Sequence, residues 1–443
     1  MFFQQAIETL PLHKLRKLQN ERLQQLVKYA WDRIPFYKKQ FTEANILPSS
    51  IKSVGDLHKI PFTKKSDLRD HYPFGMFAVP KKEVARIHCS SGTTGKPTVV
   101  GYTKKDIQIF SEVCARSLAA AGAKPGMKLQ NAYGYGLFTG GLGLHYGAEK
   151  LGMTVIPVSG GMTERQILLL RDFRPEVMSC TPSYALTVAE EIKKKGIELK
   201  ELNLKFMVLG AEPWTETIRE EVQNLLNVVA TNIYGLSEII GPGVSQEDYE
   251  ERGTGSHIWE DHFFPEVVHP ETGEPMPDGQ FGVLCFTTLT KEATPLIRYW
   301  TNDITSLHYD KSSKRTHIKM GAILGRSDDM LIIRGVNLFP SQIEAVLNDL
   351  PEFSPHYRLE ISKEGSMDQV DIHIELSEKI YKDLNTEIIL QKDLDILKSL
   401  HQKLSQKIKD NIGLTMKITL ENYQSVSRSE GGKLNRVVDK RVK

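Results

Sequence analysis

Residues 89–97 combine glycines, hydroxyls and a lysine in one short run, which is suited to binding phosphate. Backbone N–H groups, hydroxyls and an ammonium group can surround phosphate oxygens here, because glycine has no side chain to obstruct them. The run does not match the G-x-x-x-x-G-K-S/T loop, since Ser90 stands where glycine is needed and Pro97 replaces the magnesium-binding hydroxyl. A surface turn is the common alternative, but the density of these residues favours a phosphate cradle. The predicted cradle comprises Ser90, Ser91, Gly92, Thr93, Thr94, Gly95 and Lys96.

Two later segments place small, aromatic and acidic residues after apolar runs that predict strands, and ligands of open α/β sheets bind at such strand ends. In the first segment, glycine and alanine would let a flat ring approach the backbone. In the second, a tyrosine could stack on a base or an aryl ring, and a glutamate four residues later could hold a magnesium ion against phosphates. Each pattern by itself is weak, because a single tyrosine is more often a core residue. The residues are Gly210, Ala211 and Glu212 in the first segment, and Tyr234, Gly235 and Glu238 in the second.

Two charged residues in the second half of the chain could also act on a nucleotide. Asp303 follows an aromatic stretch, and a half-buried carboxylate of this kind can accept both hydroxyls of a ribose. Lys433 follows two glycines in a basic C-terminal tail, and its interpretation depends on the other motifs. Taken separately, a turn aspartate and one more solvated lysine of a basic tail are the simpler interpretations.

The elements that must position these residues follow two different patterns. Between residues 86 and 285, short β-branched or apolar runs alternate with amphipathic helices, which predicts an α/β domain. After residue 325, a strand, a helix, two strands and a long helix predict a compact α+β unit. The apolar face of the long helix carries Leu390, Leu394, Leu397, Leu404 and Ile408. We therefore predict a large multi-sheet α/β domain at 1–325, with a helical N-terminal segment at 1–75, and a small mobile α+β domain at 326–443.

Composition argues against several classes of protein. The 57 Lys and Arg residues nearly balance the 55 Asp and Glu residues without a basic stripe, so nucleic acid is not an expected partner. The four cysteines form no C-x-x-C pair, which suits a reducing cytoplasm and argues against structural zinc. The N-terminus does not read as a signal peptide, and no apolar run reaches the ~20 residues that span a bilayer. We expect a cytoplasmic enzyme with no membrane partner.

The order of the motifs resembles the superfamily of adenylate-forming enzymes, which includes acyl-CoA synthetases, luciferases and peptide-synthetase adenylation domains. SSGTTGKP, GAE, YGLSE, YWTND, GRSDDMLIIRGVNLFP and GGKLNR follow one another in that family's order along essentially the whole chain. YGLSEIIGPGV, HIWEDHFFPEV and GVNLFPSQIE look like the phenylacetate-CoA ligase branch. The resemblance implies a ligase that uses ATP, Mg²⁺ and coenzyme A, adenylates phenylacetate or a close aryl analogue, and then forms the CoA thioester in a catabolic reaction.

The same resemblance implies a role for each motif residue. Lys433 would be the catalytic lysine, Glu238 the magnesium ligand, and Asp303 the acceptor of the ribose hydroxyls. Arg326 would help position the ribose, and Asp328 would be the hinge between the domains. The cradle would hold the β- and γ-phosphates. The adenine would be framed by Gly210, Ala211, Glu212 and Tyr234, with Gly235 beside them.

The acid itself is less well defined than the reaction. Rings and small residues at 132–141 suit an aryl slot, although each ring is about as well suited to a buried core. Phenylacetate, hydroxyphenylacetate, indoleacetate and benzoate-like acids are not distinguished. The predicted walls of the slot are Tyr135, Phe138, Gly140, Pro213, Ile240 and Pro242.

Two other functions remain open at this stage, and one segment of the chain differs from the branch that it resembles. The chain could be an adenylyltransferase that modifies a deazaflavin-type cofactor or another acid, or a catalytically silent module that binds a nucleotide or an acyl-CoA. Some members of the resembling branch carry a cysteine cluster before the HxxED segment, where this chain has acidic residues. His257 and His262 remain, but such histidines are more often structural, so we expect no zinc. A homodimer is the default oligomer for an enzyme of this kind.

Overall fold

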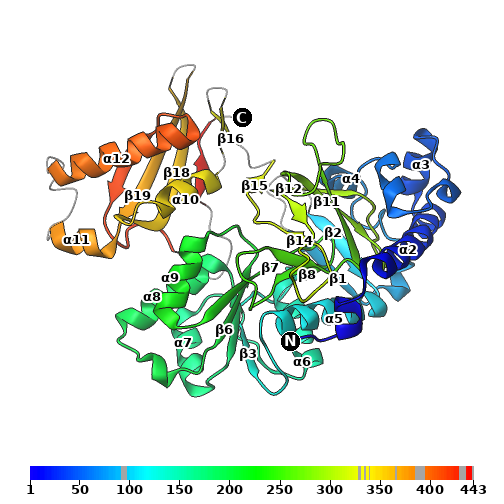
Figure 1. Ribbon diagram of the computed structural model, residues 1–443, viewed down its shortest axis with the longest axis horizontal. Coiled ribbons are helices and arrows are strands. Elements are labelled where there is room, and N and C mark those ends of the chain that lie inside the picture. Colours follow the sequence, from blue (N-terminus) through cyan, green and yellow to red (C-terminus); the bar gives the residue numbers. More distant parts are fainter. Residues whose placement is uncertain are drawn as a thin grey trace.

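The computed structural model describes residues 1–90, 97–327, 331–333, 336–338, 340–364, 367–384, 395–428 and 436–441. Figure 1 shows two bodies, a large body that carries the N-terminus and a small body that carries the elements after residue 331. We refer to the described residues up to 327 as the large body and to those from 331 onward as the small body.

The large body is built around a mixed sheet. Its strands are β3 (Lys128–Asn131), β4 (Thr154–Ile156), β5 (Val177–Cys180), β6 (Phe206–Gly210), β7 (Val229–Leu236), β8 (Gly241–Glu247), β9 (Ser256–Ile258), β13 (Leu307–His308) and β14 (Lys319–Met320). They lie in the order β13-β14-β9-β8-β7-β6-β5-β3-β4. Neighbours from β4 to β7 pair in parallel, and β8 pairs antiparallel with both β7 and β9. The parallel part is the strand and helix alternation that the sequence predicts.

Helices cover both faces of this parallel part. They are α5 (Lys104–Ala120), α6 (Gly140–Leu151), α7 (Thr163–Asp172), α8 (Pro182–Lys194) and α9 (Glu216–Leu226). Successive side chains of a strand point to opposite faces, as β6 illustrates. Met207 and Leu209 pack with α7, α8 and α9, whereas Val208 packs with α5 and α6. Both faces of the strand are buried, which explains its continuous apolar run.

A second sheet, a hairpin and the N-terminal helices complete the large body. The sheet contains β10 (Phe263–Val268), β11 (Gly282–Thr288), β12 (Tyr299–Thr305) and β15 (Gly325–Arg326), and the hairpin contains β1 (Arg86–Ser90) and β2 (Thr98–Tyr102). The helices are α1 (Gln5–Glu8), α2 (Leu12–Arg33), α3 (Pro35–Glu43) and α4 (Lys65–Asp70). Leu23 of α2 shares a hydrophobic core with Phe286 of β11. The Thr63 N–H donates to the Arg298 carbonyl at 3.1 Å and the Thr63 carbonyl accepts from Trp300 at 2.9 Å, which fixes α4 beside β12.

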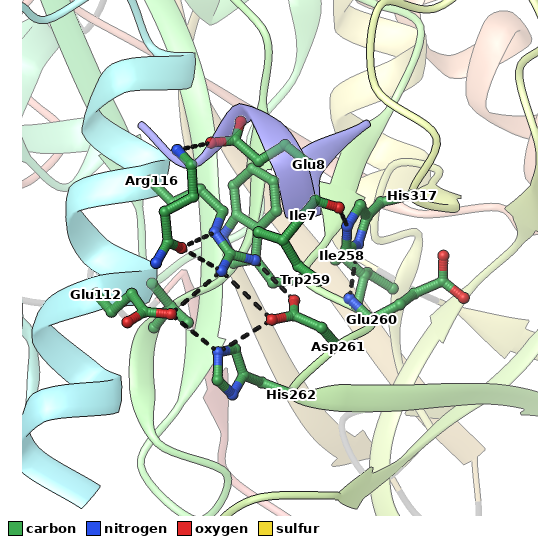
Figure 2. A network of polar contacts seen from close by, with 12 residues as sticks. Ile7, Glu8, Glu112, Arg116, Ile258, Trp259, Glu260, Asp261, His262 and His317 are labelled. Carbon is green, nitrogen blue, oxygen red and sulfur yellow. Dashed lines mark hydrogen bonds and ion pairs between the residues drawn. The ribbon is translucent and has the colours of Figure 1, made fainter. Parts of the chain in front are cut away.

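A buried polar network anchors the N-terminal helix and α5 in the large body (Figure 2). The guanidinium of Arg116 donates to Asp261 Oδ1 at 2.7 Å and to Gln4 Oε1 at 2.6 Å. The ring of His262 lies 3.2 Å from Asp261 and 3.3 Å from Glu112. Burial disfavours the Asp261 carboxylate, but the charges of His262 and Arg116 outweigh that effect and hold the pKa of Asp261 well below its usual range. The network therefore joins elements that belong to one body.

The small body has its own hydrophobic core. Its strands are β16 (Leu331–Ile333), β17 (Val336–Leu338), β18 (Phe353–Glu364), β19 (Met367–Leu376), β20 (Lys417–Glu421) and β21 (Val437–Asp439), and its helices are α10 (Pro340–Asn348), α11 (Glu378–Leu384) and α12 (Asp395–Ile412). The order β20-β19-β18-β21 forms a sheet, and β16 pairs with β17. Leu397, Leu404 and Ile408 of α12 are buried in this core, as their predicted helical face requires. Leu390 and Leu394 of the same predicted face lie outside the described residues.

The predicted fold class is confirmed, since the chain forms a large multi-sheet α/β body followed by a small α+β body. The YGLSE segment differs in one respect from the sequence-based expectation. The predicted strand ended before Tyr234, but β7 continues to Leu236 because Tyr234, Gly235 and Leu236 pair with β8. The tyrosine therefore lies within a strand, and the glutamate follows in the turn.

Candidate active site

Glu238 lies in the turn after β7, where its buried carboxylate faces the described end of the predicted phosphate cradle. Ser90 Oγ donates to Glu238 Oε1 at 3.0 Å. Ser90 ends β1, so the hairpin holds the start of the cradle against this carboxylate. The structure thus brings together two residues that are 148 positions apart in the sequence. Ser91 to Lys96, the rest of the cradle, lie outside the described residues.

Two lysines that the sequence analysis did not single out lie against the Glu238 turn. Lys65 Nζ at the start of α4 lies 3.6 Å from Glu238 Oε1. Lys291 Nζ donates to the Glu238 carbonyl at 2.9 Å and lies 5.0 Å from the centre of the Tyr102 ring. Burial lowers the pKa of Lys291 to about 8, against the opposing effect of Asp106 and Glu238. The sequence contains no clear signal for Lys291, because it follows Thr290 and precedes Glu292 in a polar segment.

Tyr234, Asp303 and Arg326 form a second cluster, with Tyr234 on β7 of the mixed sheet and the other two on β12 and β15 of the second sheet. The Tyr234 hydroxyl donates to Asp303 Oδ2 at 2.6 Å, and Arg326 NH1 donates to Asp303 Oδ1 at 3.2 Å. Arg326 reaches Asp303 because β15 pairs with β12 at these two positions. Burial and the neighbouring carboxylate raise the pKa of Tyr234 well above its usual range, so its hydroxyl remains a donor. The cluster offers a carboxylate with fixed orientation, as the binding of ribose hydroxyls requires.

The segment from Gly210 to Glu212 has a constrained backbone at the end of β6. A Cβ atom at Gly210 would lie 2.0 Å from the carbonyl oxygen of Ile233, so only glycine fits there. Ala211 has a φ of 72°, a left-handed conformation that side chains rarely adopt and that concentrates at ligand sites. Glu212 Oε1 accepts from the backbone N–H of Ser183 at 2.7 Å, at the start of α8. The bend therefore brings β6 close to β7 beside Tyr234.

Most residues of the predicted aryl slot lie on and around α6, whereas Pro213 lies between β6 and α9. The Tyr135 hydroxyl accepts from Asn131 Nδ2 at 2.8 Å, and the ring of Phe138 covers Gly140. Ile240 is buried, Pro242 lies close to α6 at Gly143, and Pro213 and Phe138 are exposed. That these residues form an aryl slot stays a prediction. The predicted walls are Tyr135, Phe138, Gly140, Pro213, Ile240 and Pro242.

The two histidines considered for zinc have different surroundings. His262 contacts Asp261 and Glu112, whereas His257 lies 3.7 Å from Glu251 and 3.1 Å from the Ser313 hydroxyl. Within the described ranges, no group of three or more His, Cys, Asp or Glu side chains has the arrangement of a metal site. In the same part of the chain, no helix has the length and apolar character needed to cross a bilayer.

The predicted site residues divide into two sets. Those brought together are Ser90 with Glu238, and Tyr234 with Asp303 and Arg326. Asp328, the predicted hinge residue, and Lys433, the predicted catalytic lysine, lie outside the described residues. Arg428 and Arg436 flank the segment of Lys433 and are both described.

Two protein-family models match the chain. The model described as AMP-binding enzyme matches residues 2–289, and the model described as AMP-binding enzyme C-terminal domain matches residues 335–441. A phenylacetate-coenzyme A ligase from Thermus thermophilus is 61% identical over 445 residues, which cover 100% of each chain.

Solved structures of 2-hydroxyisobutyryl-CoA ligase add information on the arrangement of the bodies. In its postadenylation state this ligase is 28% identical with a TM-score of 0.89, and the match covers 98% of this chain and 91% of that chain. In complex with CoA in its thioesterification state it is 29% identical with a TM-score of 0.72, covering 98% and 92%. Because both structures are of one ligase, the difference between the scores reflects how that ligase is arranged in each state.

Proposed function

This chain belongs to the AMP-binding enzyme family, and we propose that it joins phenylacetate to coenzyme A with ATP, releasing AMP and pyrophosphate. It is an AMP-forming acid–CoA ligase, since phenylacetate-coenzyme A ligases are 48–61% identical to it over nearly its full length. The observation that carries the proposal to individual residues is the turn after β7. Tyr234 near the end of β7 contacts Asp303 and Glu238 in the turn contacts Ser90, so this strand end and its turn link the proposed ribose end of a nucleotide site to its phosphate end.

The first half-reaction must activate the acid. A free carboxylate resists a thiol because it is anionic and has no good leaving group. In the proposed step, a carboxylate oxygen of phenylacetate attacks the α-phosphorus of ATP in line, the bond to the β-phosphate breaks, and pyrophosphate leaves. Lys433 would stabilise the charge on the transferring oxygens, while Asp303 and Arg326 would hold the ribose so that the reacting atoms stay aligned.

Magnesium that accompanies ATP fits the residues present. Mg²⁺ commonly takes one or two protein carboxylates and completes its shell with phosphate oxygens and water, so Glu238 would be a sufficient protein ligand. Bound there, the ion would withdraw charge from the phosphates. Lys65, 3.6 Å from the same carboxylate, would add positive charge at this end of the site, as would the cradle from Ser90 to Lys96. Gly210, Ala211, Glu212 and Gly235 would border the adenine.

The second half-reaction must admit CoA. The CoA thiol gives its proton to solvent as its sulfur attacks the acyl carbon, a carbon–sulfur bond forms, and the bond from the acyl carbon to the AMP oxygen breaks, so that AMP leaves. We propose that a domain at 326–443 turns about Asp328 relative to a domain at 1–325, so that Lys433 leaves the site and CoA enters. The different TM-scores for the two states of the related ligase support such a change of arrangement.

The proposal also covers the assembly and location of the enzyme. We propose a homodimer, the common form of soluble enzymes, and a cytoplasmic location in which the four cysteines stay reduced. Cys89, Cys114, Cys180 and Cys285 are all free thiols in the structure. A molar mass in solution tests the dimer.

The experiment that tests the function measures pyrophosphate and AMP release with ATP, Mg²⁺ and a panel of arylacetates, benzoates and aliphatic acids, each with and without CoA. We expect AMP release that depends on both phenylacetate and CoA. Lys433→Ala should reduce adenylation by at least about 10²-fold, because a charge that acts only in the transition state is lost. Lys440→Ala, a change at another basic residue of the C-terminal tail, is the matched control.

Three outcomes would contradict this assignment. Pyrophosphate release that is indifferent to CoA would indicate an adenylyltransferase. ATP binding without turnover of any acid would indicate a silent binding module. Unchanged adenylation by the Lys433→Ala variant would remove the catalytic role from that lysine.

A further inference from the structure

The two bodies meet along α8 and α9. Figure 1 shows these helices on the side of the large body that faces α10 and α11 of the small body. Near the start of α9, Thr215 and Ile218 line a cavity of about 20 Å³ together with Glu344 and Leu347 of α10. A space of this size holds about one water molecule, so the bodies are in direct contact here.

At the same interface, Glu190 of α8 contacts two side chains of the small body. His356 Nε2 lies 3.2 Å from Glu190 Oε1, and Arg428 Nε donates to Glu190 Oε2 at 3.1 Å. Both oxygens of the carboxylate are thus engaged across the interface. Arg428 also donates to Glu375 of the small body at 2.5 and 2.9 Å, which fixes the direction of its guanidinium.

These side chains are shielded from water. Glu190, Arg428 and His356 are 10%, 17% and 4% exposed. Burial disfavours the Glu190 carboxylate, but His356 and Arg428 outweigh that effect and lower its pKa. Charges in such surroundings interact more strongly than charges on the surface, and removing one partner leaves the other poorly solvated.

We propose that Glu190 is a positioning residue that holds the small body in the orientation of the adenylation half-reaction through Arg428 and His356. This clamp, defined as Glu190, Arg428 and His356, must open before the thioester half-reaction. The inference rests on the proposed function, and nothing in the chemistry of adenylation requires Glu190 to touch a substrate.

Two observations support the assignment of the clamp to one half-reaction. The chain is more similar to the related ligase in its postadenylation state than in its thioesterification state, so the contacts described here belong to an arrangement of the first kind. Arg428 also precedes the proposed catalytic Lys433 by only five residues. Fixing Arg428 on α8 therefore restricts where the segment of Lys433 begins.

The test separates the two half-reactions in the full-length enzyme. Adenylation is followed as pyrophosphate release without CoA, and thioester formation as consumption of preformed phenylacetyl-adenylate by CoA. Glu190→Gln keeps the shape of the side chain and removes its charge. A hydrogen bond to a charged group changes an equilibrium by about 10- to 100-fold. We therefore expect the adenylation rate to decrease by about 10- to 100-fold, and the rate of thioester formation to stay unchanged or to increase.

The control variant is Glu191→Gln on the same helix. Glu191 pairs with Lys194 of its own helix at 3.3 Å and is 31% exposed. The Glu191→Gln variant should keep the rates of both half-reactions within about twofold of the wild type. Arg428→Gln should lower adenylation at least as much as Glu190→Gln, because it also removes the hydrogen bonds to Glu375. The double variant should be little worse than Arg428→Gln alone, because both changes break the contact between Glu190 and Arg428.

A distance measurement makes the result independent of catalysis. Dyes attached through azido side chains at the exposed positions 17 in α2 and 402 in α12 report the arrangement of the bodies by energy transfer. With ATP bound, Glu190→Gln should populate a second distance that the Glu191→Gln variant lacks. If the enzyme shows this shift but makes no thioester, the proposed function is contradicted and the clamp is still supported.

Two results would overturn the clamp in an active enzyme. One is an equal fall of both half-reactions in Glu190→Gln, together with a lower melting temperature, which would show a merely structural role. The other is the absence of any difference between the Glu190→Gln and Glu191→Gln variants in rates and in dye distance.

Discussion

The cluster at Arg116 and the cluster at Glu190 use the same three kinds of side chain, an arginine, a histidine and carboxylates, but they connect different parts of the molecule. Arg116 and Asp261 are 0% and 3% exposed, and their partners all belong to the large body (Figure 2). Glu190 is 10% exposed and its partners Arg428 and His356 belong to the small body.

The difference shows how one chemistry can serve two purposes. Within one body, a buried ion pair is formed on folding and broken only on unfolding, so it contributes to stability. Between two bodies, a pair that retains some access to water can be broken without exposing a hydrophobic core, so it contributes to the balance between two arrangements. Burial and connectivity decide the role.

The largest expected effect is on the cluster within the large body. Arg116→Leu leaves Asp261 without its closest cation, so we expect a loss of about 3 kcal/mol of unfolding free energy. This loss of stability lies at the low end of the range found when one partner of a buried ion pair is removed, because Arg22 NH1 remains 3.8 Å from Asp261. Denaturant titration measures the loss, and the ratio of the two half-reaction rates should stay as in the wild type.

The matched control for this variant is Arg171→Leu. Arg171 pairs with Glu201 at 2.6 Å, but the two side chains are 47% and 36% exposed, so the pair contributes little. If the two variants lost equal stability, burial would not be the property that distinguishes the Arg116 cluster.

A smaller effect is expected from pH at the interface between the bodies. Burial, and then the neighbouring Glu190, raise the pKa of Glu221 on α9 to about 7, against the opposing charges of Arg428 and Lys193. Glu190 stays charged near neutral pH, since its pKa is lowered. The pKa of His356 is also lowered, so below about pH 6.5 this histidine opposes the effect of Glu221. Docking of the small body should therefore be coupled to protonation of Glu221.

The sign follows from linkage. A carboxyl group with a raised pKa in the docked arrangement binds a proton there, so the contribution of Glu221 to docking weakens as the pH rises from about 5 to about 7 and then stays constant. The ratio of adenylation to thioester formation should fall over this range by at most about tenfold per pH unit. Glu221→Gln, which stays neutral, should flatten the profile; an unchanged slope in this variant would exclude Glu221 as its origin.

The smallest effect is expected at the exposed pair of the same interface. Lys193 Nζ lies 2.6 Å from Glu378, but the side chains are 56% and 31% exposed. Lys193→Ala should change the adenylation rate by less than about fivefold, because surface pairs contribute roughly 0–1 kcal/mol. A change as large as that of Glu190→Gln would show that charge across the interface, and not burial, controls the arrangement.

Much of the fold could be predicted because strands and helices leave periodic patterns in the sequence. The apolar run of β6 and the charged face of α8 were both visible, as were the turn residues around Gly210 and Glu238. The extension of β7 through Tyr234 was missed, because it depends on pairing with β8. Glu190 and Lys193 stand in a charged helical run that reads as a solvated surface, and only the docked small body shows that they lie at an interface.

The sequence by itself determined which chemical groups this protein has available: a run of glycines and hydroxyls with Lys96 that predicts a phosphate cradle, the acidic residues Glu238 and Asp303, and a basic C-terminal segment with Lys433. Only the tertiary structure decided which groups act on one another. Lys65 meets Glu238, Arg326 meets Asp303, and Arg428 meets Glu190 across separations of 23 to 238 residues. The physical reason is that residue type and local spacing fix propensity and charge, whereas pKa values and ion pairs depend on distance and burial, which arise only when the chain is packed.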